Sequence, residues 1–497
     1  FWNFERSTGR LVISGSGDMY DYDEVSLYPS SSSFTVESPF TKNYRGIRNV
    51  VVEDGVTSVG DYAFFDCRNV SSVEISDTVT DIGRCAFFWN GISSVTIPAN
   101  VRSLGVQAFS YCWNLRKVTL SEGLESIGRS AFYVCKNLTE ITIPDSVTKI
   151  EDDIFKTTAY YNKSSNWVNG GLYCGNHLIK AATNASGTFK IREGTRTIAE
   201  EAFIDCKNIK EVVMPQSVVA IGDYAFRNCT GLESVVIPKG TVTVGEYAFY
   251  ECTGIKAVKV SDTVRYIGYG AFLNCSDIGK VYIDDIESWM NLEFDSIGSN
   301  PAYNGADFYV GNKLLTKLVI PENITEIGDN TFYNCTSLTE VTFPENLEKI
   351  GRYAFYGCSN LGKVLLPDNV KEIGMEAFLG CSKLKTVSLG KKLEKIEDRV
   401  FYDCVTLENI VIPDSVTVVE NSAFCNCKSL TEIKIPDKVT VIDDNALRNC
   451  VNLRKAVIGK SVTEIGRNAF YYCVNLTDIT IPSSVKNMDY TFCASSF

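Results

Sequence analysis

The amino-acid sequence repeats itself about every 23 residues, and this repeat limits the possible folds more than any other feature. Cysteine and phenylalanine mark it. Cys335, Cys358 and Cys381 lie 23 residues apart, and fourteen of the eighteen cysteines share this repeat position. A Phe stands three residues before such a cysteine, and among the sixteen repeats with this slot only that of Leu447 lacks Phe. A unit this short cannot bury its own apolar side chains, so successive units must stack.

A single unit predicts the local structure of all of them. Ile141-Thr142-Ile143 alternates apolar and polar residues, which predicts a short strand with two side chains inward. Pro144 then ends the strand, and ten of the thirteen prolines hold this position, where no ladder N–H is needed. For the next segment, as in Gly128–Cys135, we expect one or two turns of α- or 3₁₀-helix. Other residues replace its first Gly in several units, so a positive φ is not required there.

Stacking of these units predicts an α/β repeat solenoid, with a parallel β-sheet on the concave face and short helical or 3₁₀ segments opposite. The spacing of Leu, Val, Pro, Ile-Gly and Ala-Phe-x-x-Cys across Leu338–Cys358 resembles the BspA-like, or treponemal-type, leucine-rich repeats. Thr8–Tyr22 is similar to the N-terminal cap strand of such proteins. The resemblance implies a leucine-rich-repeat superhelix. It also implies a bacterial protein, secreted or on the cell surface, of a family that includes adhesins for host extracellular matrix or other cells.

The repeat also predicts the domain organisation: an N-terminal cap over residues 1–45 and a single solenoid over 46–497. The register breaks twice, because Phe155 and Phe203 are 48 residues apart and Phe272 and Phe332 are 60 apart. Each break contains Gly-Asn between β-forming residues, which predicts hairpin insertions at about 156–187 and 284–314. We expect a short helix within 286–294.

The insertions are the most aromatic stretches of the chain, and insertions in a solenoid often carry binding sites. Their rings serve either to bind a ligand or to pack each hairpin onto its neighbours. The candidate binding residues are Tyr160, Tyr161, Trp167, Tyr173, Trp289, Tyr303, Phe308 and Tyr309.

A second candidate surface is formed by the residue that lies between the two inward aliphatics of each strand and faces outward. Several of these residues are apolar where solvent is expected, which suits contact with a protein or glycan. The alternative is that β-propensity alone places Val there. The row comprises Val213, Val236, Lys259, Tyr282, Val319, Thr342, Leu365, Ser388, Val411, Lys434, Val457 and Thr480, of which we select Val213, Val236, Tyr282, Val319 and Leu365 as binding residues.

The cysteines could be paired, metal-binding or buried thiols. There is no Cys-x-x-Cys, and equivalent cysteines on adjacent units would have nearly parallel Cα–Cβ vectors, which suit a disulfide poorly. We therefore expect thiols buried beside Phe, with no metal. Outside the repeat position, the better candidates for a disulfide or an exposed thiol are Cys85, Cys174, Cys425 and Cys493.

Few catalytic arrangements are possible in this chain, because His177 is its only histidine. A Cys174–His177 nucleophile and base is one hypothesis. Residues three apart on a strand face opposite sides unless a turn intervenes, so a surface histidine is the alternative that we favour. We predict no catalytic residues and no cofactor.

Charge and hydropathy argue against nucleic acid as a partner and against a membrane-spanning segment. The net charge of −12 would repel a phosphate backbone, so we expect no nucleic acid, and no apolar run approaches the ~20 residues that span a bilayer. The predicted function is therefore non-enzymatic adhesion to host or neighbouring-cell proteins or glycans, with a structural spacer of the bacterial envelope as the alternative.

The two ends of the sequence suggest a piece of a longer protein. Phe1 opens the chain without an initiator Met or a leader, as in a mature or trimmed fragment. Residues after Pro482 lack the repeat register and form a poor cap. We expect that the natural protein continues past Phe497 and that residues 483–497 are irregular.

Overall fold

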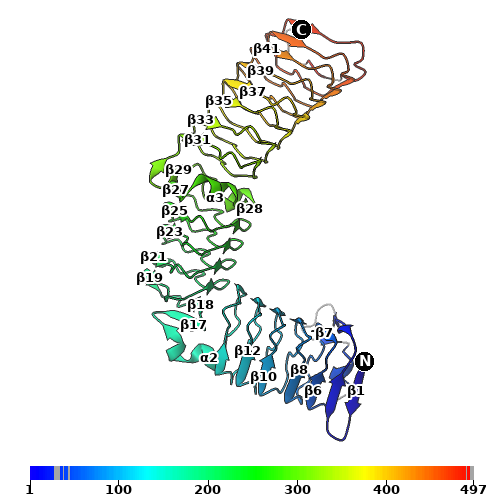
Figure 1. Ribbon diagram of the computed structural model, residues 1–497, viewed down its shortest axis with the longest axis vertical. Coiled ribbons are helices and arrows are strands. Elements are labelled where there is room, and N and C mark those ends of the chain that lie inside the picture. The colour runs from blue at the N-terminus through cyan, green and yellow to red at the C-terminus, as the bar shows by residue number, and fades with distance from the viewer. Residues whose placement is uncertain (27–33, 37, 43–44, 489, 493–497) are drawn as a thin grey trace. The chain divides into compact units, whose positions relative to one another are not determined.

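The computed structural model describes residues 1–26, 34–36, 38–42, 45–488 and 490–492 (Figure 1). Its internal contacts divide the chain into two compact units. The first unit is Phe1–Leu232 with Gly240–Cys252, and the second is Glu233–Lys239 with Thr253–Phe497. Each is described by itself below. The extent of a single solenoid over residues 46–497 stays a prediction.

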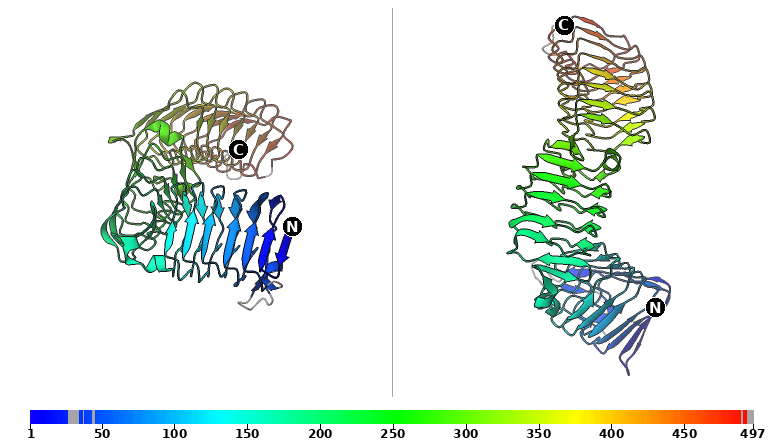
Figure 2. Two further views of the ribbon diagram at one scale, coloured as in Figure 1. Left: turned by 60° about the horizontal axis from the view of Figure 1, so that its bottom comes forward. Right: turned by 60° about the vertical axis from the view of Figure 1, so that its left-hand side comes forward.

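Each unit is a stack of coils, and most coils contribute one strand to a first row and a shorter strand to a second row (Figure 2). In the first unit the first row contains β6 (Asn49–Val52), β8 (Ser72–Ile75), β10 (Ser94–Ile97), β12 (Lys117–Leu120), β14 (Glu140–Thr142), β19 (Ser186–Lys190) and β21 (Asn208–Val213). The second row contains β7 (Val56–Val59), β9 (Asp81–Ile82), β11 (Ser103–Leu104), β13 (Ser126–Ile127), β15 (Lys149–Ile150), β20 (Thr197–Ile198), β22 (Ala220–Ile221) and β24 (Thr243–Val244).

The second unit repeats this arrangement. Its first row contains β23 (Ser234–Val236), β25 (Ala257–Val260), β27 (Lys280–Ile283), β31 (Lys317–Val319), β33 (Glu340–Thr342), β35 (Lys363–Leu365), β37 (Thr386–Ser388), β39 (Asn409–Val411), β41 (Glu432–Lys434), β43 (Lys455–Val457) and β45 (Asp478–Thr480). Its second row contains β26 (Tyr266–Ile267), β32 (Glu326–Ile327), β34 (Lys349–Ile350), β36 (Glu372–Ile373), β38 (Lys395–Ile396), β40 (Val418–Val419), β42 (Val441–Ile442) and β44 (Glu464–Ile465).

The strands are parallel, and the sequence period sets their register. Val118 of β12 pairs with Ile141 of β14, one repeat later, and Val364 of β35 pairs with Val387 of β37. Along β12 the burial alternates between exposed and buried residues, as the sequence pattern predicts. The predicted parallel-sheet solenoid is therefore confirmed.

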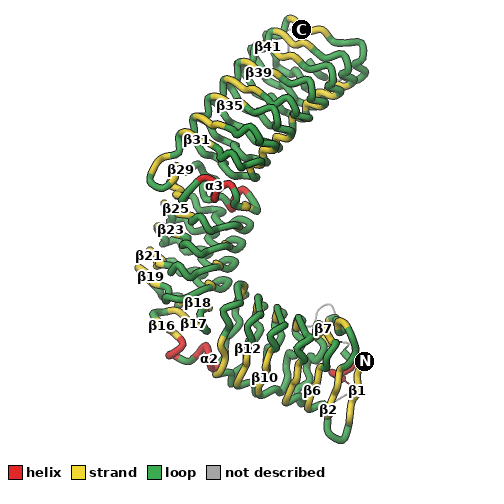
Figure 3. The backbone as a smooth tube through the Cα atoms, in the orientation of Figure 1, coloured by secondary structure: helices red, strands yellow, loops and turns green. Residues whose placement is uncertain are grey.

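The segments opposite the first row are hydrogen-bonded turns, so the expected α- or 3₁₀-helices are wrong for this part of the coil (Figure 3). In Gly128–Cys135, Ser130 and Val134 have positive φ values of 56° and 58°, which interrupt a right-handed helix. Their N–H groups, and that of Phe132, donate to carbonyls of the next coil at 2.9 to 3.1 Å. Bonding between coils thus replaces the helical i to i−4 ladder.

Gly128 shows why glycine is frequent at the start of this segment. A Cβ at this position would lie 2.6 Å from the backbone nitrogen of Val106 in the preceding coil. The close approach of two backbones, rather than a positive φ, therefore requires the absence of a side chain.

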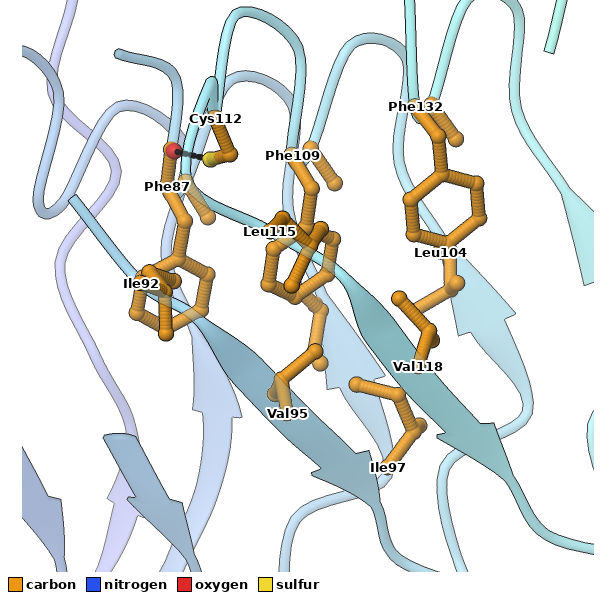
Figure 4. Packing of buried hydrophobic residues seen from close by; sticks show 14 of the residues in the cluster. Phe87, Ile92, Val95, Ile97, Leu104, Phe109, Cys112, Leu115, Val118 and Phe132 are labelled. Atoms are coloured by element: carbon orange, nitrogen blue, oxygen red, sulfur yellow. Dashed lines mark hydrogen bonds between the residues drawn. The ribbon is translucent and has the colours of Figure 1, made fainter. Parts of the chain in front are cut away.

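The core of each unit is a column of stacked phenylalanine rings. Phe355, Phe378, Phe401 and Phe424 stack with centroid separations of 5.3 to 5.7 Å and interplanar angles of 6° or less. In the first unit Phe87, Phe109 and Phe132 form the same column above the strand residues Val95 and Val118 (Figure 4).

The repeat-position cysteines lie beside this column, and most of them donate a hydrogen bond to the carbonyl of one of its phenylalanines. Cys112 Sγ donates to the carbonyl oxygen of Phe87 at 3.2 Å (Figure 4), and Cys381 Sγ donates to that of Phe355 at 3.4 Å. All seventeen cysteines of the described residues are buried thiols. The expectation of buried thiols at the repeat position is confirmed.

The remaining candidates for a disulfide or an exposed thiol are corrected. Cys85, Cys174 and Cys425 are also buried thiols, because the turns and the first hairpin cover them. Cys493 lies outside the described residues.

Both insertions contain the predicted hairpins. The first comprises α2 (Ala159–Asn162), η1 (Ser164–Asn166) and the antiparallel strands β16 (Trp167–Val168), β17 (Gly171–Cys174) and β18 (His177–Ala181). The second comprises α3 (Ile286–Met290), which confirms the expected short helix, β28 (Glu293–Phe294), η2 (Ile297–Ser299) and the antiparallel pair β29 (Asp307–Val310) and β30 (Lys313–Leu314).

The N-terminal segment contains β1 (Trp2–Glu5), β2 (Arg10–Ile13), β3 (Gly17–Asp18), β4 (Glu24–Ser26), β5 (Phe34–Val36) and α1 (Pro39–Lys42). β2 pairs with β1 in the antiparallel sense and with β6 in the parallel sense, so it extends the first row within the segment expected to be a cap.

The last described residues only partly fit the expectation of an irregular end, because they form turns without a strand but keep two contacts of the repeat. Asn487 forms a bridge with Glu464, and Phe492 stacks on Phe470 at 5.4 Å. Phe492 takes the repeat Phe slot, although Thr491 replaces the usual Ala and Ser495 stands where the repeat Cys would be. Residues 489 and 493–497, which the same expectation included, lie outside the described residues.

Candidate binding surfaces

The outward row of the second unit, defined here as the last residues of the first-row strands β31, β33, β35, β37, β39, β41, β43 and β45, is a continuous exposed strip. It alternates apolar and polar side chains from strand to strand. Val319 is 69% exposed, Leu365 is 50% and Val411 is 76%, while their inward neighbours Leu318 and Val364 are buried. The full order is Val319, Thr342, Leu365, Ser388, Val411, Lys434, Val457 and Thr480. Exposed apolar side chains therefore recur at every second coil.

A line of acidic and basic residues flanks this outward row, and their side chains form ion pairs with one another. Glu340 contacts Lys317 at 3.0 Å and Lys363 at 3.1 Å, and these two ammonium groups lower the pKa of its carboxyl. Lys455 lies 3.7 Å from Glu432 and 3.8 Å from Asp478. The charged side chains beside the row are thus paired within the protein. The apolar side chains of the row are therefore the groups that remain to contact a partner.

The remaining selected strand residues have the same orientation. Val213 is 42% exposed and Val236 is 53% exposed. Tyr282 is half-buried because its ring stacks on that of Tyr309 at 4.9 Å. Tyr309 is the register partner of Tyr282 on β29, so the second insertion adds an aromatic side chain to the outward face of this sheet.

The aromatic residues of the first insertion are held by packing. Tyr160 and Tyr173 are buried, and the Tyr160 hydroxyl donates to the Tyr173 carbonyl at 2.8 Å. Tyr161 and Trp167 are half-buried with their rings edge to face at 5.4 Å, and Trp167 Nε1 donates to the Tyr161 carbonyl. These contacts support the packing interpretation of the hairpin.

Trp289 and Phe308 in the second insertion are also core residues. Trp289 is 2% exposed, its Nε1 donates to the Thr331 carbonyl at 2.8 Å, and its ring contacts Phe294 and Phe308. The half-buried Tyr303 accepts a hydrogen bond from the Asn274 N–H at 2.7 Å. Of the eight aromatic candidates, Tyr309 is the one that the structure brings onto the outward sheet face.

The structure pairs Cys174 with His177 across the turn between β17 and β18, and both are fully buried. The expected surface histidine is therefore wrong. His177 Nε2 donates to the Pro144 carbonyl at 2.9 Å, Nδ1 has no hydrogen-bond partner among the described residues, and burial lowers the histidine pKa to about 4. Burial raises the pKa of the Cys174 thiol to about 11. A protonated, inaccessible thiol is not an activated nucleophile.

Two further observations concern the expectations of no metal site and no membrane-spanning segment. No cluster of metal-ligating side chains occurs among the residues that the structure describes. Within those same residues, no helix has both the length and the apolar character needed to cross a bilayer.

The sequence matches the family model described as BspA type leucine-rich repeat region, in six copies, over residues 37–162, 182–297, 305–429 and 394–496. These matches cover most of the chain. The chain belongs to the BspA-type leucine-rich repeat family. No curated protein matches it by sequence.

Several solved structures are similar to this BspA-type chain. A leucine-rich repeat protein from Eubacterium ventriosum is 26% identical, with 75% of this chain and 90% of that chain covered and a TM-score of 0.31. One from Bacteroides ovatus is 22% identical over 88% and 93%, with a TM-score of 0.28. A leucine rich cell surface protein from Faecalibacterium prausnitzii is 21% identical over 96% and 92%, with a TM-score of 0.24.

Proposed function

We propose that this BspA-type protein is a non-enzymatic binding protein, secreted or displayed on the bacterial surface, that mediates adhesion to host or neighbouring-cell proteins or glycans. One observation carries the proposal: Val319, Leu365, Val411 and Val457 stand exposed at two-coil intervals on a sheet whose flanking charges are already paired. Membership of a repeat family supports a binding role, and the buried state of Cys174 and His177 argues against their use as a nucleophile and base.

The outward row fits a protein partner. Its apolar side chains would bury against apolar side chains of the partner, which is the usual source of affinity at the centre of a protein interface. Because the neighbouring Lys and Glu residues neutralise each other, the row favours a partner surface of low charge over a polyanion. We commit to a protein of this kind as its occupant.

Surface plasmon resonance of the full chain on immobilised matrix proteins and mucins tests the proposal. The double variant Val319→Glu/Val411→Glu should weaken binding to the captured protein at least about tenfold, because it places charges in an apolar interface. Val242→Glu is the matched control, since Val242 is 44% exposed away from this row and its variant should bind as the wild type does.

Two outcomes would contradict the proposal. If both variants lost binding equally, the added negative charge itself, and not its position in the outward row, would explain the loss. Absence of binding across the panel, with the chain folded, would favour the envelope spacer.

A further inference from the structure

A groove of about 860 Å³ lies over the turn segments of successive coils in the second unit, on the side of the coil away from the outward row. Its floor carries Asp403, Asn426 and Asn449, which occupy one repeat position two residues after the core Phe slot. All three have a positive φ, between 57° and 63°, a conformation that Asn and Asp tolerate better than other non-glycine residues.

The floor residues form a directed polar ladder. Asn426 Nδ2 donates to Asp403 Oδ1 at 2.6 Å, and Asn449 Nδ2 donates to Asn426 Oδ1. An amide group has two N–H donors and a carbonyl oxygen with two lone pairs, so the ladder uses only part of the capacity of each side chain. The rest is available to a ligand with closely spaced hydroxyl groups.

Tyrosine rings line the groove beside this ladder and at its end. Tyr402 and Tyr471 are half-buried, and Tyr472 is 47% exposed at the repeat position that follows Asn449 in the next coil. The Arg448 guanidinium lies over the Tyr471 ring at 5.1 Å, which holds both side chains in place. Fixed aromatic faces beside planar amides suit the apolar faces and hydroxyl edges of sugar rings.

The groove has no net charge to attract a polyion. Its two acidic residues, Glu376 and Asp403, are matched by Arg399 and Arg448, and Arg399 Nη1 lies 2.9 Å from Glu376 Oε1. Leu379 is its only aliphatic lining residue, so it lacks the apolar pockets that anchor peptides. Sulfated polymers and peptides are therefore disfavoured.

We propose that this groove binds a neutral oligosaccharide along the direction of the stack. Core rings of successive coils beneath it lie 5.3 to 5.7 Å apart, close to the length of one sugar unit in an extended chain, so successive coils meet successive sugars. The site is separate from the outward row, and its test does not depend on the protein-binding role.

An array of neutral, sialylated and sulfated oligosaccharides, followed by calorimetry on the full chain, tests the inference. Neutral oligosaccharides should bind, and Asn426→Gly and Tyr472→Asn should each weaken binding about tenfold or more. Asn228→Gly and Tyr111→Asn are matched controls, because these residues hold the same repeat position with φ values of 59° and 60° outside the groove. Both control proteins should bind as the wild type does.

Hydrogen exchange of the unmodified chain gives a second measurement that needs no variant. A saturating neutral oligosaccharide should slow exchange in residues 399–403, 422–426 and 445–449. The inference is overturned if only sulfated or sialylated glycans bind, if no neutral glycan binds, if the controls lose as much affinity as the groove variants, or if the slowed exchange lies elsewhere.

Discussion

At the scale of the residue, the repeat-position cysteine does more than fill space. In most coils its thiol donates to the carbonyl of a core Phe in the preceding coil, as Cys404 does to Phe378 and Cys427 does to Phe401, both at 3.3 Å. Burial raises the pKa of these thiols, so they stay protonated and remain donors. The sequence indicates a small buried hydrophobe at this position, but a hydrogen bond between coils cannot be inferred from spacing alone.

Thiol reagents provide the first prediction. In the native protein almost no cysteine should react at neutral pH, because the described cysteines are buried and protonated. In denaturant without reductant, nearly all should react. Titration with a chromogenic disulfide measures both states, and recovery of fewer than half of the thiols after denaturation would contradict the buried-thiol core.

A second prediction isolates the thiol hydrogen bond. Cys381→Ala should lower the free energy of unfolding by about 1–2 kcal/mol, because the Phe355 carbonyl loses one of its two donors and a small void forms. Ser388→Ala, at an exposed position of the same coil, is the control and should cost less. Denaturant unfolding measures both, and equal costs would argue against a contribution from the thiol.

The third prediction concerns His177 and pH. Its pKa falls from about 6.5 when unfolded to about 4 when folded, so the unfolded state binds the proton more tightly. Stability from this group is complete above pH 6.5 and declines as the pH falls toward 4, by on the order of 2–3 kcal/mol. Hydrogen exchange of residues 171–181 at pH 7 and pH 5 measures the effect.

The variant His177→Gln is the control for this pH effect, because an amide can still donate to the Pro144 carbonyl but does not titrate. It should lose most of the acid-dependent exchange in the hairpin. An unchanged pH profile in the variant would show that another group is responsible.

At the scale of the element, the coil combines what the sequence predicts with what only tertiary contacts decide. Strand position, strand register and both hairpins follow from local alternation, Pro and Gly-Asn. The turn segment does not, because residues such as Ser130 and Val134 have no intrinsic preference for a positive φ and adopt it to bond the next coil. The burial of Trp289 and the groove over Asn426 likewise depend on neighbouring coils.

The stacked rings give a prediction at this scale. Phe378→Ala should cost about 3–5 kcal/mol locally, because it removes a fully buried ring from the column. Leu365→Ala, on an exposed position of the outward row, should change stability by less than about 0.5 kcal/mol. Hydrogen exchange around residues 370–400 should accelerate in the first variant only, and unchanged exchange there would disprove the stacked-ring core.

At the scale of the whole molecule, each coil contacts mainly its neighbours, so the number of coils is not fixed by the fold. The outward row adds a second rule, because its apolar members recur at every second coil. Removal of a single coil therefore preserves the stacked core, whereas only removal of two coils preserves the alternation of apolar and polar residues on the binding surface.

Excision of whole coils tests this difference. Removal of residues 364–386 joins Lys363 to Val387 in register and should leave a folded protein, but Ser388 then follows Thr342 in the row. Removal of 364–409 puts Val411 in the place of Leu365 and keeps the alternation. Circular dichroism should show both folded, and binding to the protein partner should survive only in the longer excision.

The thiols that bond to carbonyls also determine how the chain can be produced. A cysteine-rich exported protein commonly needs an oxidant and an isomerase, because its possible disulfide connectivities multiply with each added cysteine. In the described coils the cysteines are buried free thiols, and those at the repeat position, such as Cys381, lie beside phenylalanine. We therefore expect these coils to fold without a redox catalyst, under reducing or anaerobic conditions alike.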